Sequence, residues 1–441
     1  MKRNQRLLNL LSILCILLIL AACAPAPAAT EAPAANEPVT LTWLIDDSQQ
    51  SQEGHKAIAD AYMALHPNVT IEFENRPQGG DGDNIVKTRL ATGEMTDLFS
   101  YNSGSLLQAL HPADTLVDLT SEPFVANVVE SFLPTVSQDS KVFGVPDGTA
   151  MGGGILYNKK VYTDLGLSVP KTWAEFEANN EKIKAAGIAP VIASYGPNST
   201  WTSQLFVLAD YCNVQNAMPT FAADYTANKL KMAETPAALA GFNYLAEGNE
   251  KGWYQEDFTT ATFDQALQLL AEGKGAHYPM LSFALAPIAS NWPDAVKDIG
   301  YFGQPGTDAS KHCTTLWMPG GTYIPKTTKN LAAAKDVLAF MASVEGTDAM
   351  TAKVPPQGPY MVKGSKLPAD ALPAVLDIQA YIEGGTSVPA LEFLSPIKGP
   401  ALEQITVAVG SGQMTPEEGA ANYDEDVKKQ AQQLGLPEWT E

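Results

Sequence analysis

Apolar and polar residues alternate along the chain first with the period of strands and then with that of helices. Residues 39–46 (VTLTWLID) alternate as in a buried strand, and residues 53–65 carry apolar side chains at helical spacing. Further strands are predicted at 68–74 and 97–101, with a helix ending at Gly93 between them. Strands and helices that alternate at this spacing predict a mostly parallel, helix-covered sheet.

A second α/β series follows, with apolar positions of its own. Its predicted helices cover 171–186, 237–252 and 263–275, and its predicted strands cover 188–196 and 276–281. A further helix, 331–343, is predicted after a strand that contains Trp317. Because 441 residues are enough for two cores, we expect an α/β protein of two lobes or two domains.

The stretch Gly144–Lys160 (GVPDGTAMGGGILYNKK) lies between the two series. Its glycines Gly152–Gly154 allow backbone freedom, and an apolar run resumes directly after them. These residues fit a hinge or an ordinary glycine-rich loop equally well. A second glycine-bearing strand, Trp317–Gly321, lies where a returning hinge strand would be needed, which favours the hinge.

The N-terminal residues indicate secretion. Residues 1–22 combine a basic tip with the apolar run Leu7–Leu20, which is shorter than the roughly 20 residues that span a bilayer, so we predict a signal peptide. The ending Leu-Ala-Ala-Cys resembles the lipobox of bacterial lipoproteins, in which Cys23 would carry lipid. The alternative is a cleavage site that merely contains a cysteine. Residues 23–38, rich in Ala and Pro, predict a tether, and we expect an extracytoplasmic lipoprotein anchored to the cell membrane.

Charge and cysteine content narrow the possible partners. The formal net charge is −21, and loss of the three basic residues of the signal peptide would make it −24. Such a surface repels nucleic acid and anionic lipid, so we predict no nucleic-acid partner. Cys212 and Cys313 could pair outside the cytoplasm or remain buried thiols, and we slightly favour unpaired thiols.

Polar and aromatic candidates for a ligand site gather at predicted strand ends and at the hinge. Carboxylates and amides match the hydroxyl groups of a sugar, and aromatic rings match its C–H faces. The polar candidates are Asp46, Asp47, Asn102 and Asp147, and the stacking candidates are Trp43, Trp201, Tyr278 and Trp317. The alternatives are a solvated helix start for the aspartates and a place in the core for the rings. Arg76 could donate to a ligand, but a surface role is favoured.

Three stretches resemble a known family. They are GVPDGTAMGGGILYNKKVYTDLGLSVPKTWAEF, FDQALQLLAEGKGAHYPM and GGTYIPKTTKNLAAAKDVLAFMAS. Their order and spacing resemble family 1 solute-binding proteins of ABC importers, the carbohydrate-binding kind to which maltose-binding protein belongs. Many relatives carry a sugar-stacking tryptophan after the second stretch. This chain reads HYPMLSF there, so Tyr278 or Phe283 could substitute for it.

The resemblance implies a periplasmic-binding-protein-like fold with a sugar in the cleft between two lobes. The implied lobes are 39–152 with 320–365, and 153–319 with 366–441. It implies that Ile155–Asn158 and Trp317–Gly321 cross between the lobes, with Gly320 near the ligand. The hinge is assigned to Gly154, Ile155, Leu156, Met318 and Pro319.

The implied function is the capture of a mono- or oligosaccharide by hinge closure, followed by delivery to ABC importer permease subunits. We expect a monomer without cofactor or metal. GGDGDN after the second strand resembles a calcium loop only loosely. The competing hypotheses are a surface glycoside hydrolase using Asp46 and Asp147 as paired carboxylates, or a binder of a non-sugar solute. The sequence contains no HExxH, GxSxG or GxxxxGK[ST] motif, which argues against several enzyme classes.

Overall fold

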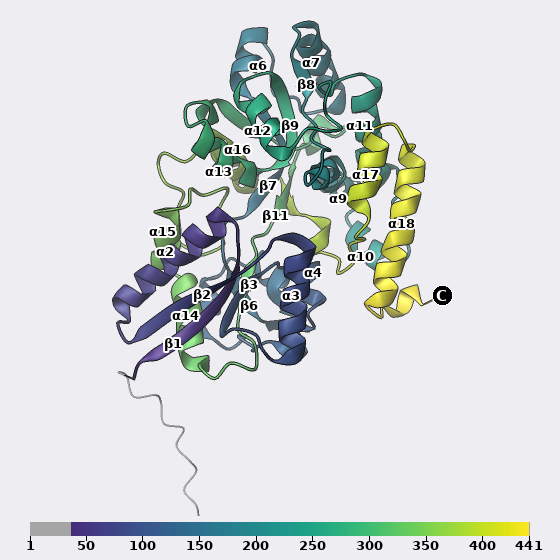
Figure 1. The fold of residues 1–441 in the computed structure, drawn as a ribbon. Helices are drawn as coiled ribbons and strands as arrows, with labels where there is room; N and C mark the ends of the chain where they lie inside the picture. Colours follow the sequence, from purple (N-terminus) through teal and green to yellow (C-terminus); the bar gives the residue numbers. More distant parts are fainter. Residues whose placement is uncertain (1–36, 441) are drawn as a thin grey trace, which may run out of the picture. The chain divides into compact units, whose positions relative to one another are not determined.

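Two β-sheets organise the fold, and each takes strands from distant parts of the chain (Figure 1). The computed structural model describes residues 37–440. The predicted signal peptide (residues 1–22), the anchor Cys23 and the tether as far as residue 36 lie outside the described residues. Contacts between Cα atoms join Thr40–Glu441 into one compact unit.

The first sheet has the strand order β2-β1-β3-β12-β6. Its strands are β1 (Val39–Asp46), β2 (Val69–Arg76), β3 (Leu98–Tyr101), β6 (Gly144–Pro146) and β12 (Gly321–Tyr323). Its helices are α2 (Gln49–Leu65), α3 (Gly79–Thr92), α14 (Leu331–Met341) and α15 (Val344–Thr351). β1 and β3 are parallel, whereas β12 runs antiparallel to β3 and β6.

The helix after β1 begins four residues before its predicted start. Ser48 caps it, because its side-chain oxygen accepts a hydrogen bond from the Ser51 amide at 3.2 Å. The buried face of the helix includes Ile58 and Tyr62, which attach it to the core. Its first turn is thereby fixed next to the end of β1.

The second sheet is built around the long strand β7. Its order is β13-β11-β7-β9-β8, and β10 also pairs with β7. The strands are β7 (Met151–Asn158), β8 (Ala189–Val191), β9 (Gly275–Leu281), β10 (Ile299–Phe302), β11 (Thr314–Trp317) and β13 (Ser387–Pro389). β7 is antiparallel to β9, β10 and β11. Both sheets are therefore mixed rather than mostly parallel, because β7 and β12 each enter a sheet from the opposite direction.

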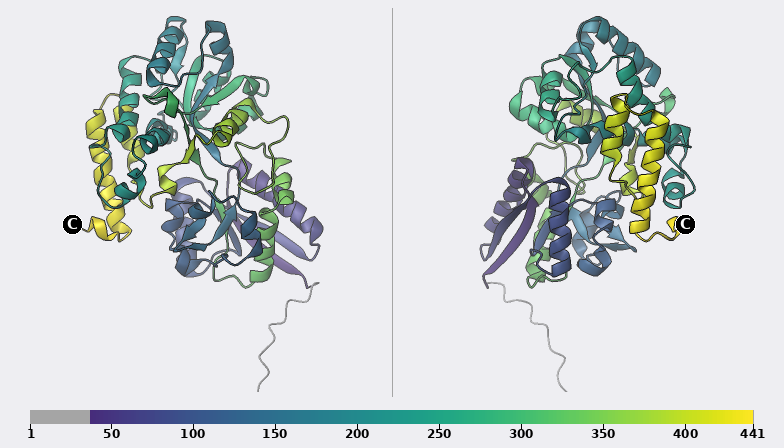
Figure 2. Two further views of the ribbon diagram at one scale, coloured as in Figure 1. Left: turned by 180° about the vertical axis from the view of Figure 1, so that it is seen from behind. Right: turned by 45° about the vertical axis from the view of Figure 1, so that its right-hand side comes forward.

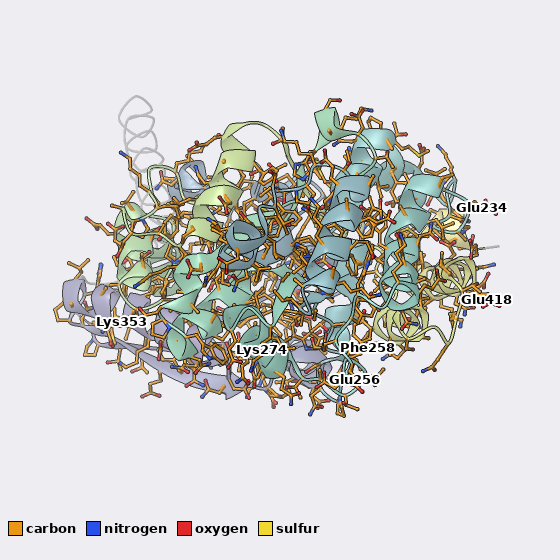
Figure 3. All side chains as sticks on the ribbon, turned by 90° about the horizontal axis from the view of Figure 1, so that it is seen from above. Glu234, Glu256, Phe258, Lys274, Lys353 and Glu418 are labelled. Atoms are coloured by element: carbon orange, nitrogen blue, oxygen red, sulfur yellow. A yellow bond between two sulfur atoms is a disulfide. The ribbon has the colours of Figure 1, made fainter. Side chains whose placement is uncertain are left out.

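Helices cover the second sheet and complete its cores (Figures 1 and 2). The longer ones are α7 (Trp173–Ala185), α11 (Pro236–Glu250), α12 (Phe263–Ala271), α16 (Pro373–Glu383), α17 (Leu402–Gly410) and α18 (Pro416–Gln433). α17 and α18 pack against α11, and their apolar residues join the core around Trp173 and Trp253. Charged side chains such as Glu234, Lys274 and Glu418 point outward (Figure 3).

The remaining elements are short. They are α4 (Ser105–Gln108), α5 (Pro112–Thr115), α6 (Lys159–Leu165), α8 (Leu205–Leu208), α9 (Tyr211–Ala217), α10 (Phe221–Thr226), α13 (Leu285–Asn291), β4 (Ser137–Gln138) and β5 (Lys141–Val142), with 3-10 turns that include η4 (Thr200–Gln204) and η5 (Ser282–Ala284). Within residues 37–440, no helix has both the length and the apolar character needed to cross a membrane.

Cys212 and Cys313 form a disulfide, so the preference for unpaired thiols was wrong. Their Cα atoms lie 6.1 Å apart although 101 positions separate them in the chain. The bond joins α9 to the residue immediately before β11. Only the packing of these two segments could reveal the pairing, since the sequence contains no signal for it.

Within residues 37–440 the chain passes between the two sheets at three places. β6 leads to β7 through Asp147–Ala150, and β11 leads to β12 through Met318–Gly320. The third passage is the long segment 352–372 between α15 and α16. The predicted crossing at Ile155–Asn158 is therefore misplaced. Those residues, and with them the assigned hinge residues Gly154, Ile155 and Leu156, pair inside the second sheet.

The three glycines of β7 permit close packing and do not form a flexible segment. Their backbone is regular strand. A Cβ atom on Gly152 would lie 2.7 Å from Ile378, and one on Gly154 would lie 2.6 Å from the Phe302 carbonyl oxygen. A Cβ atom on Gly153 would overlap the Trp317 ring. The prediction of backbone freedom at this position was wrong, because Ile378 of α16, Trp317 of β11 and the backbone of β10 fill the space beside the glycines.

Candidate ligand-binding site

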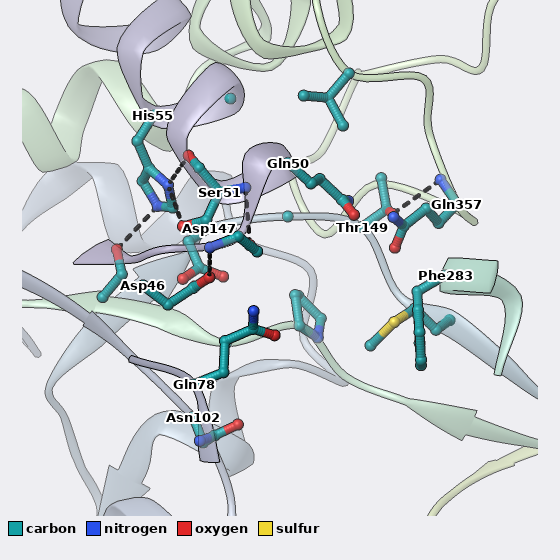
Figure 4. Close-up of a pocket in the computed structure, with 18 of the residues that line it drawn as sticks. Asp46, Gln50, Ser51, His55, Gln78, Asn102, Asp147, Thr149, Phe283 and Gln357 are labelled. Atoms are coloured by element: carbon teal, nitrogen blue, oxygen red, sulfur yellow. Dashed lines mark hydrogen bonds between the residues drawn. The ribbon is translucent and has the colours of Figure 1, made fainter. Parts of the chain in front are cut away.

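A cavity of about 690 Å³ opens where the ends of the first sheet meet elements of the second (Figure 4). Its polar lining residues come from the ends of strands, the starts of α2 and α3, and the segment 352–372, and the same side also contributes the apolar residues Met350, Val354, Pro355 and Pro356. The polar lining residues include Asp46, Gln50, Ser51, Arg76, Gln78, Asp83, Asn102, Asp147, Thr149 and Gln357. The second sheet and its connections contribute Met151, Phe283 and Pro287, which are apolar.

Strand ends position the polar wall. Asp46 and Arg76 are the last residues of β1 and β2, and Asn102 directly follows β3. Asp147 follows β6, and Gly320 precedes β12. The carboxyl ends of neighbouring parallel strands meet at one edge of a sheet, so residues far apart in sequence converge there. Of the nine predicted ligand residues, the cavity lining includes Asp46, Asn102, Asp147 and Gly320.

Asp147 lies beside a second carboxylate. Burial and the neighbouring Asp46 carboxylate raise the pKa of Asp147 to about 7, although Arg76 acts in the opposite direction. Asp46 Oδ1 accepts a hydrogen bond from the Ser48 amide at 2.9 Å. The Asp147 amide donates to the Gly320 carbonyl oxygen at 3.2 Å, which joins two of the passages between the sheets. Near neutral pH, Asp147 can therefore donate or accept a hydrogen bond, depending on its protonation.

Gly320 must remain small at this junction. A Cβ atom there would lie 2.8 Å from the Tyr101 carbonyl oxygen and 3.0 Å from Asp147 Oδ1. Any larger residue would push against the carboxylate that faces the cavity. Gly320 thus shapes the cavity wall through its lack of a side chain.

Arg76 is only 6% exposed, so the favoured surface role was wrong. Its Nη1 and Nη2 donate to the carbonyl oxygens of Pro77 at 3.2 Å and Ser100 at 3.4 Å, and its guanidinium lies 5.6 Å from the centre of the Tyr101 ring. Within residues 37–440, Arg76 forms no ion pair. The positive charge therefore moderates the field of the aspartates around the cavity without neutralising any one of them.

Trp43 lies in the core, outside the cavity lining, and is fully buried. Its Nε1 donates to Ser100 Oγ at 3.2 Å. His55 Nδ1 donates to the Ser51 carbonyl oxygen at 2.7 Å, which leaves Nε2 to accept from Ser100 Oγ at 2.9 Å. Burial lowers the pKa of His55, so the ring is neutral. Trp43 thus supports the residues that line the cavity.

The other predicted residues outside the lining differ in their surroundings. Tyr278 is 1% exposed, and its hydroxyl lies 2.7 Å from Ser194 Oγ. Trp317 packs in a small buried cluster with Ala209 and Ala390. Trp201 is partly buried and contacts Phe283. Asp47 is exposed, and its Oδ1 accepts from Gln78 Nε2 at 3.5 Å.

The side chains of the two hinge candidates in the second passage, Met318 and Pro319, line different cavities. Pro319 lines the cavity, while Met318 lines a separate cavity of about 660 Å³. Successive residues of an extended segment face opposite sides, which explains this division.

Gln357 is the main cavity residue that the sequence analysis missed. Its main-chain amide donates to Thr149 Oγ1 at 3.3 Å, and its main-chain carbonyl oxygen accepts from Ser282 Oγ at 2.6 Å. Its side-chain Nε2 has no hydrogen-bond partner within residues 37–440. It lies in the irregular segment 352–372, where no periodicity distinguishes one polar residue from another. Phe283, considered only as a substitute for tryptophan, lines the cavity together with the aromatic residues Tyr101 and Tyr360.

The residues of GGDGDN, compared above with a calcium loop, begin helix α3. Across residues 37–440, no group of three or more His, Cys, Asp or Glu side chains is placed to hold a metal ion.

Two α/β lobes joined by crossing segments, with a polar and aromatic cavity between them, define a two-lobed binding protein. The chain belongs to the family described as "Bacterial extracellular solute-binding protein", whose sequence model matches residues 46–348. Membership in this family places the protein outside the cytoplasm. It is also a family of binding proteins rather than enzymes.

Individual relatives agree with this assignment. The chain is 25% identical over 312 residues to the "Multiple sugar-binding protein" of Streptococcus mutans, covering 69% of this chain and 71% of that protein. It is also 25% identical over 317 residues to the "Melibiose/raffinose/stachyose-binding protein MelE" of Bacillus subtilis, covering 69% and 70%. The solved structure of a "Chitin oligosaccharide binding protein" matches with a TM-score of 0.75 and 22% identity over 90% of this chain and 99% of that one. The predicted two-lobed fold is confirmed.

Proposed function

We propose that this protein captures a neutral sugar or oligosaccharide and delivers it to the permease of an ABC importer. The observation that carries the proposal is the division of the cavity lining between polar groups and apolar or aromatic side chains, among them Phe283. A sugar has hydroxyl groups around its edge and C–H groups on its faces, so this division suits it. The printed names of relatives, among them two sugar-binding proteins and one ABC transporter extracellular-binding protein, support the same class.

In this proposal Asp46, Asn102, Asp147 and Gln357 bind sugar hydroxyls, and Phe283 packs on a sugar face. Each buried polar group left without a partner by a wrong epimer costs about 1–3 kcal/mol, which gives the site its discrimination. Gly320 contributes by leaving room beside Asp147. Trp43, Tyr278 and Trp317 support the site from the core, because their burial keeps them from the ligand.

Closure of the two lobes follows from the same arrangement. The polar groups belong mainly to the first lobe, so the sugar binds there first, and the wall with Phe283 then closes on it. The bending positions are the passages Asp147–Ala150 and Met318–Gly320. In this proposal the lobe limits lie at these passages and in the segment 352–372. Changing the open-to-closed ratio from 1:99 to 99:1 requires about 5.5 kcal/mol of differential binding, which several hydrogen bonds and one stacked ring can supply.

The remaining parts of the proposal concern location and assembly. The lipobox-like sequence supports a lipid on Cys23, with residues 24–38 as a tether to the membrane. The protein acts as a monomer, and the permease recognises its closed form. Growth of a strain in [3H]palmitate, followed by comparison with Cys23→Ser, tests the anchor. Equal label in both proteins would contradict it.

A thermal-shift screen of the chain without residues 1–22 tests the sugar class. A ligand at 100 times its Kd stabilises the folded state by about 2.7 kcal/mol. For about 400 residues this corresponds to a rise in Tm of about 3 °C. The rise should be smaller in Asp147→Asn and unchanged in Asp139→Asn, a matched change outside the cavity lining. A polyol or peptide that raises Tm where all sugars fail would contradict the sugar class.

One observation favours the hydrolase alternative: Asp46 lies near Asp147, whose pKa is raised. Incubation with bound oligosaccharide distinguishes the two functions. A binding protein returns the sugar intact, whereas turnover that disappears with Asp147→Asn would identify an enzyme.

A further inference from the structure

A second cavity, of about 660 Å³, is nearly as large as the candidate ligand site. None of the residues proposed to contact the sugar lines it. Its lining is largely apolar and includes Val129, Leu316, Met318, Met361, Leu376 and Ile382. The proposed function therefore leaves this space without a role.

The two cavities lie on either side of the passages between the sheets. Pro319 lines the candidate ligand site and the preceding Met318 lines the second cavity, while Tyr360 lines both. The Ala150 amide donates to the Pro359 carbonyl oxygen at 2.8 Å, which joins the first passage to the segment 352–372. The segments that bend during closure thus form the partition between the cavities.

The walls of the second cavity belong to different lobes. The Val129 amide donates to the Met361 carbonyl oxygen at 2.9 Å, and Asn127 Nδ2 donates at 3.1 Å to the carbonyl oxygen of Ala342, at the end of α14. This wall is therefore fastened to the first lobe. The facing wall consists of α16 and β13, which pack on or pair within the second sheet. Because the partition bends, a rotation that brings the lobes together around the sugar separates these two walls.

The polar groups of the second cavity indicate which molecule it suits. Ser365 Oγ is buried and has no hydrogen-bond partner within residues 37–440, so it is free to bind one polar group of a ligand. The charged lining residues, Lys366 and Glu383, are exposed and of opposite sign. Glu383 Oε1 also accepts from Gln379 Nε2 at 2.9 Å. The lining thus offers one buried hydrogen-bonding group, a large apolar surface and no net charge.

We propose that the second cavity binds a small uncharged molecule with an apolar body and one hydroxyl or carbonyl group, and that this molecule strengthens sugar binding. The effect on sugar rests on the proposed function. A molecule between the two walls resists their approach, and it therefore resists opening of the lobes around the sugar. By linkage, bound sugar raises the affinity of the second cavity by the same factor.

Isothermal titration with n-octanol tests the site, because this molecule has an apolar chain and a single hydroxyl. Ser365→Ala should weaken its binding by about 2- to 10-fold, the range for one hydrogen bond. Leu376→Gln should weaken it by about 3- to 10-fold, since Leu376 is 49% exposed and presents an uncovered apolar side chain. Octanoate and octylammonium should bind at least about 10-fold more weakly, because their charges would be buried without a partner.

Leu394→Gln is the matched control. Leu394 is 44% exposed and lies outside the lining of the second cavity, so its replacement should leave n-octanol binding unchanged. Equal losses in the two leucine variants would show binding to the general surface and would overturn the proposal. Displacement of n-octanol by excess sugar would place it in the candidate ligand site and would overturn the proposal as well.

Titration of a sugar from the thermal-shift screen, with and without saturating n-octanol, tests the coupling. Sugar affinity should rise by about twofold or more, and the gain should shrink in Leu376→Gln. An unchanged or weaker sugar affinity would refute the coupling. If a sugar binds but n-octanol does not, the second site is wrong and the proposed function stands. If n-octanol binding depends on Ser365 and Leu376 but no sugar binds, the proposed function alone fails.

Discussion

Asp210 offers a sharp test of how buried charge affects this fold. Its side chain is 1% exposed, and its Oδ1 accepts from Asn213 Nδ2 at 2.7 Å. Its Oδ2 and the neighbouring Gln304 Oε1 both lack a hydrogen-bond partner within residues 37–440. Gln304 Nε2 is already used, since it donates to the Phe206 carbonyl oxygen at 2.9 Å. A proton on Asp210 Oδ2 is the donor that this pair of oxygens lacks.

Burial raises the pKa of Asp210 from 3.8 to about 7, against the lowering effect of the neighbouring Asn213 and Gln304 side chains. Because the folded state holds its proton more tightly, the contribution to stability is fully present below pH 3.8 and is lost as pH rises through 7. A shift of about three pKa units corresponds to about 4 kcal/mol. At pH 8 the ionised side chain therefore destabilises the folded state by about this amount relative to the neutral acid.

Asp210→Asn replaces the carboxyl group with an amide of the same shape that remains neutral at every pH. Its NH2 group can donate to Gln304 Oε1 while its oxygen accepts from Asn213. The variant should match the unmodified protein at pH 4 and exceed its stability at pH 8 by up to about 4 kcal/mol. For about 400 residues this is a rise in Tm of about 5 °C, measurable by scanning calorimetry at the two pH values.

Asp424→Asn provides the contrast. Asp424 is also buried, but both of its oxygens accept from main-chain amides, those of Met232 at 2.8 Å and Ala233 at 3.0 Å. An amide NH2 there would face an N–H donor, so this variant should lose stability at both pH values. The reasoning about Asp210 is refuted if Asp210→Asn shows no gain at pH 8 relative to pH 4.

Three further predictions follow from the packing and the site. Sugar affinity should increase from pH 5 to pH 8 as Asp147 ionises, and Asp147→Asn should remove that dependence in titrations at both pH values; an unchanged slope would exclude Asp147 from the site. Gly153→Ala should lower the free energy of unfolding, measured in urea, by about 1–3 kcal/mol, because the new methyl group would overlap the Trp317 ring. The exposed Gly166 cannot serve as a control, because its positive φ would strain an alanine there. The double variant Cys212→Ser with Cys313→Ser should lower the free energy of unfolding by up to about 4.7 kcal/mol. An unchanged Tm would show that the disulfide does not stabilise the fold.

Much of the architecture could be predicted from local pattern. β1 spans the predicted residues, and α2, α11 and α14 lie where apolar spacing placed them. The polar half of the site was also accessible, because residues that follow strands gather at one sheet edge whatever the details of packing. Asp46 and Asn102 were identified on that ground and Asp147 at the predicted hinge, and all three line the cavity, whereas Asp47 does not.

The sequence by itself therefore determined the α/β series, the family motifs and the polar strand ends, since each depends on neighbours within a few residues. Only the tertiary structure decided which rings are sealed and which remain open, because an aromatic residue has the same local pattern in either place. Trp43 is enclosed by Phe73, His55 and Ser100, whereas Phe283 meets the cavity. The role of Gln357 and the disulfide likewise depend on segments distant in sequence, whose approach no local pattern specifies.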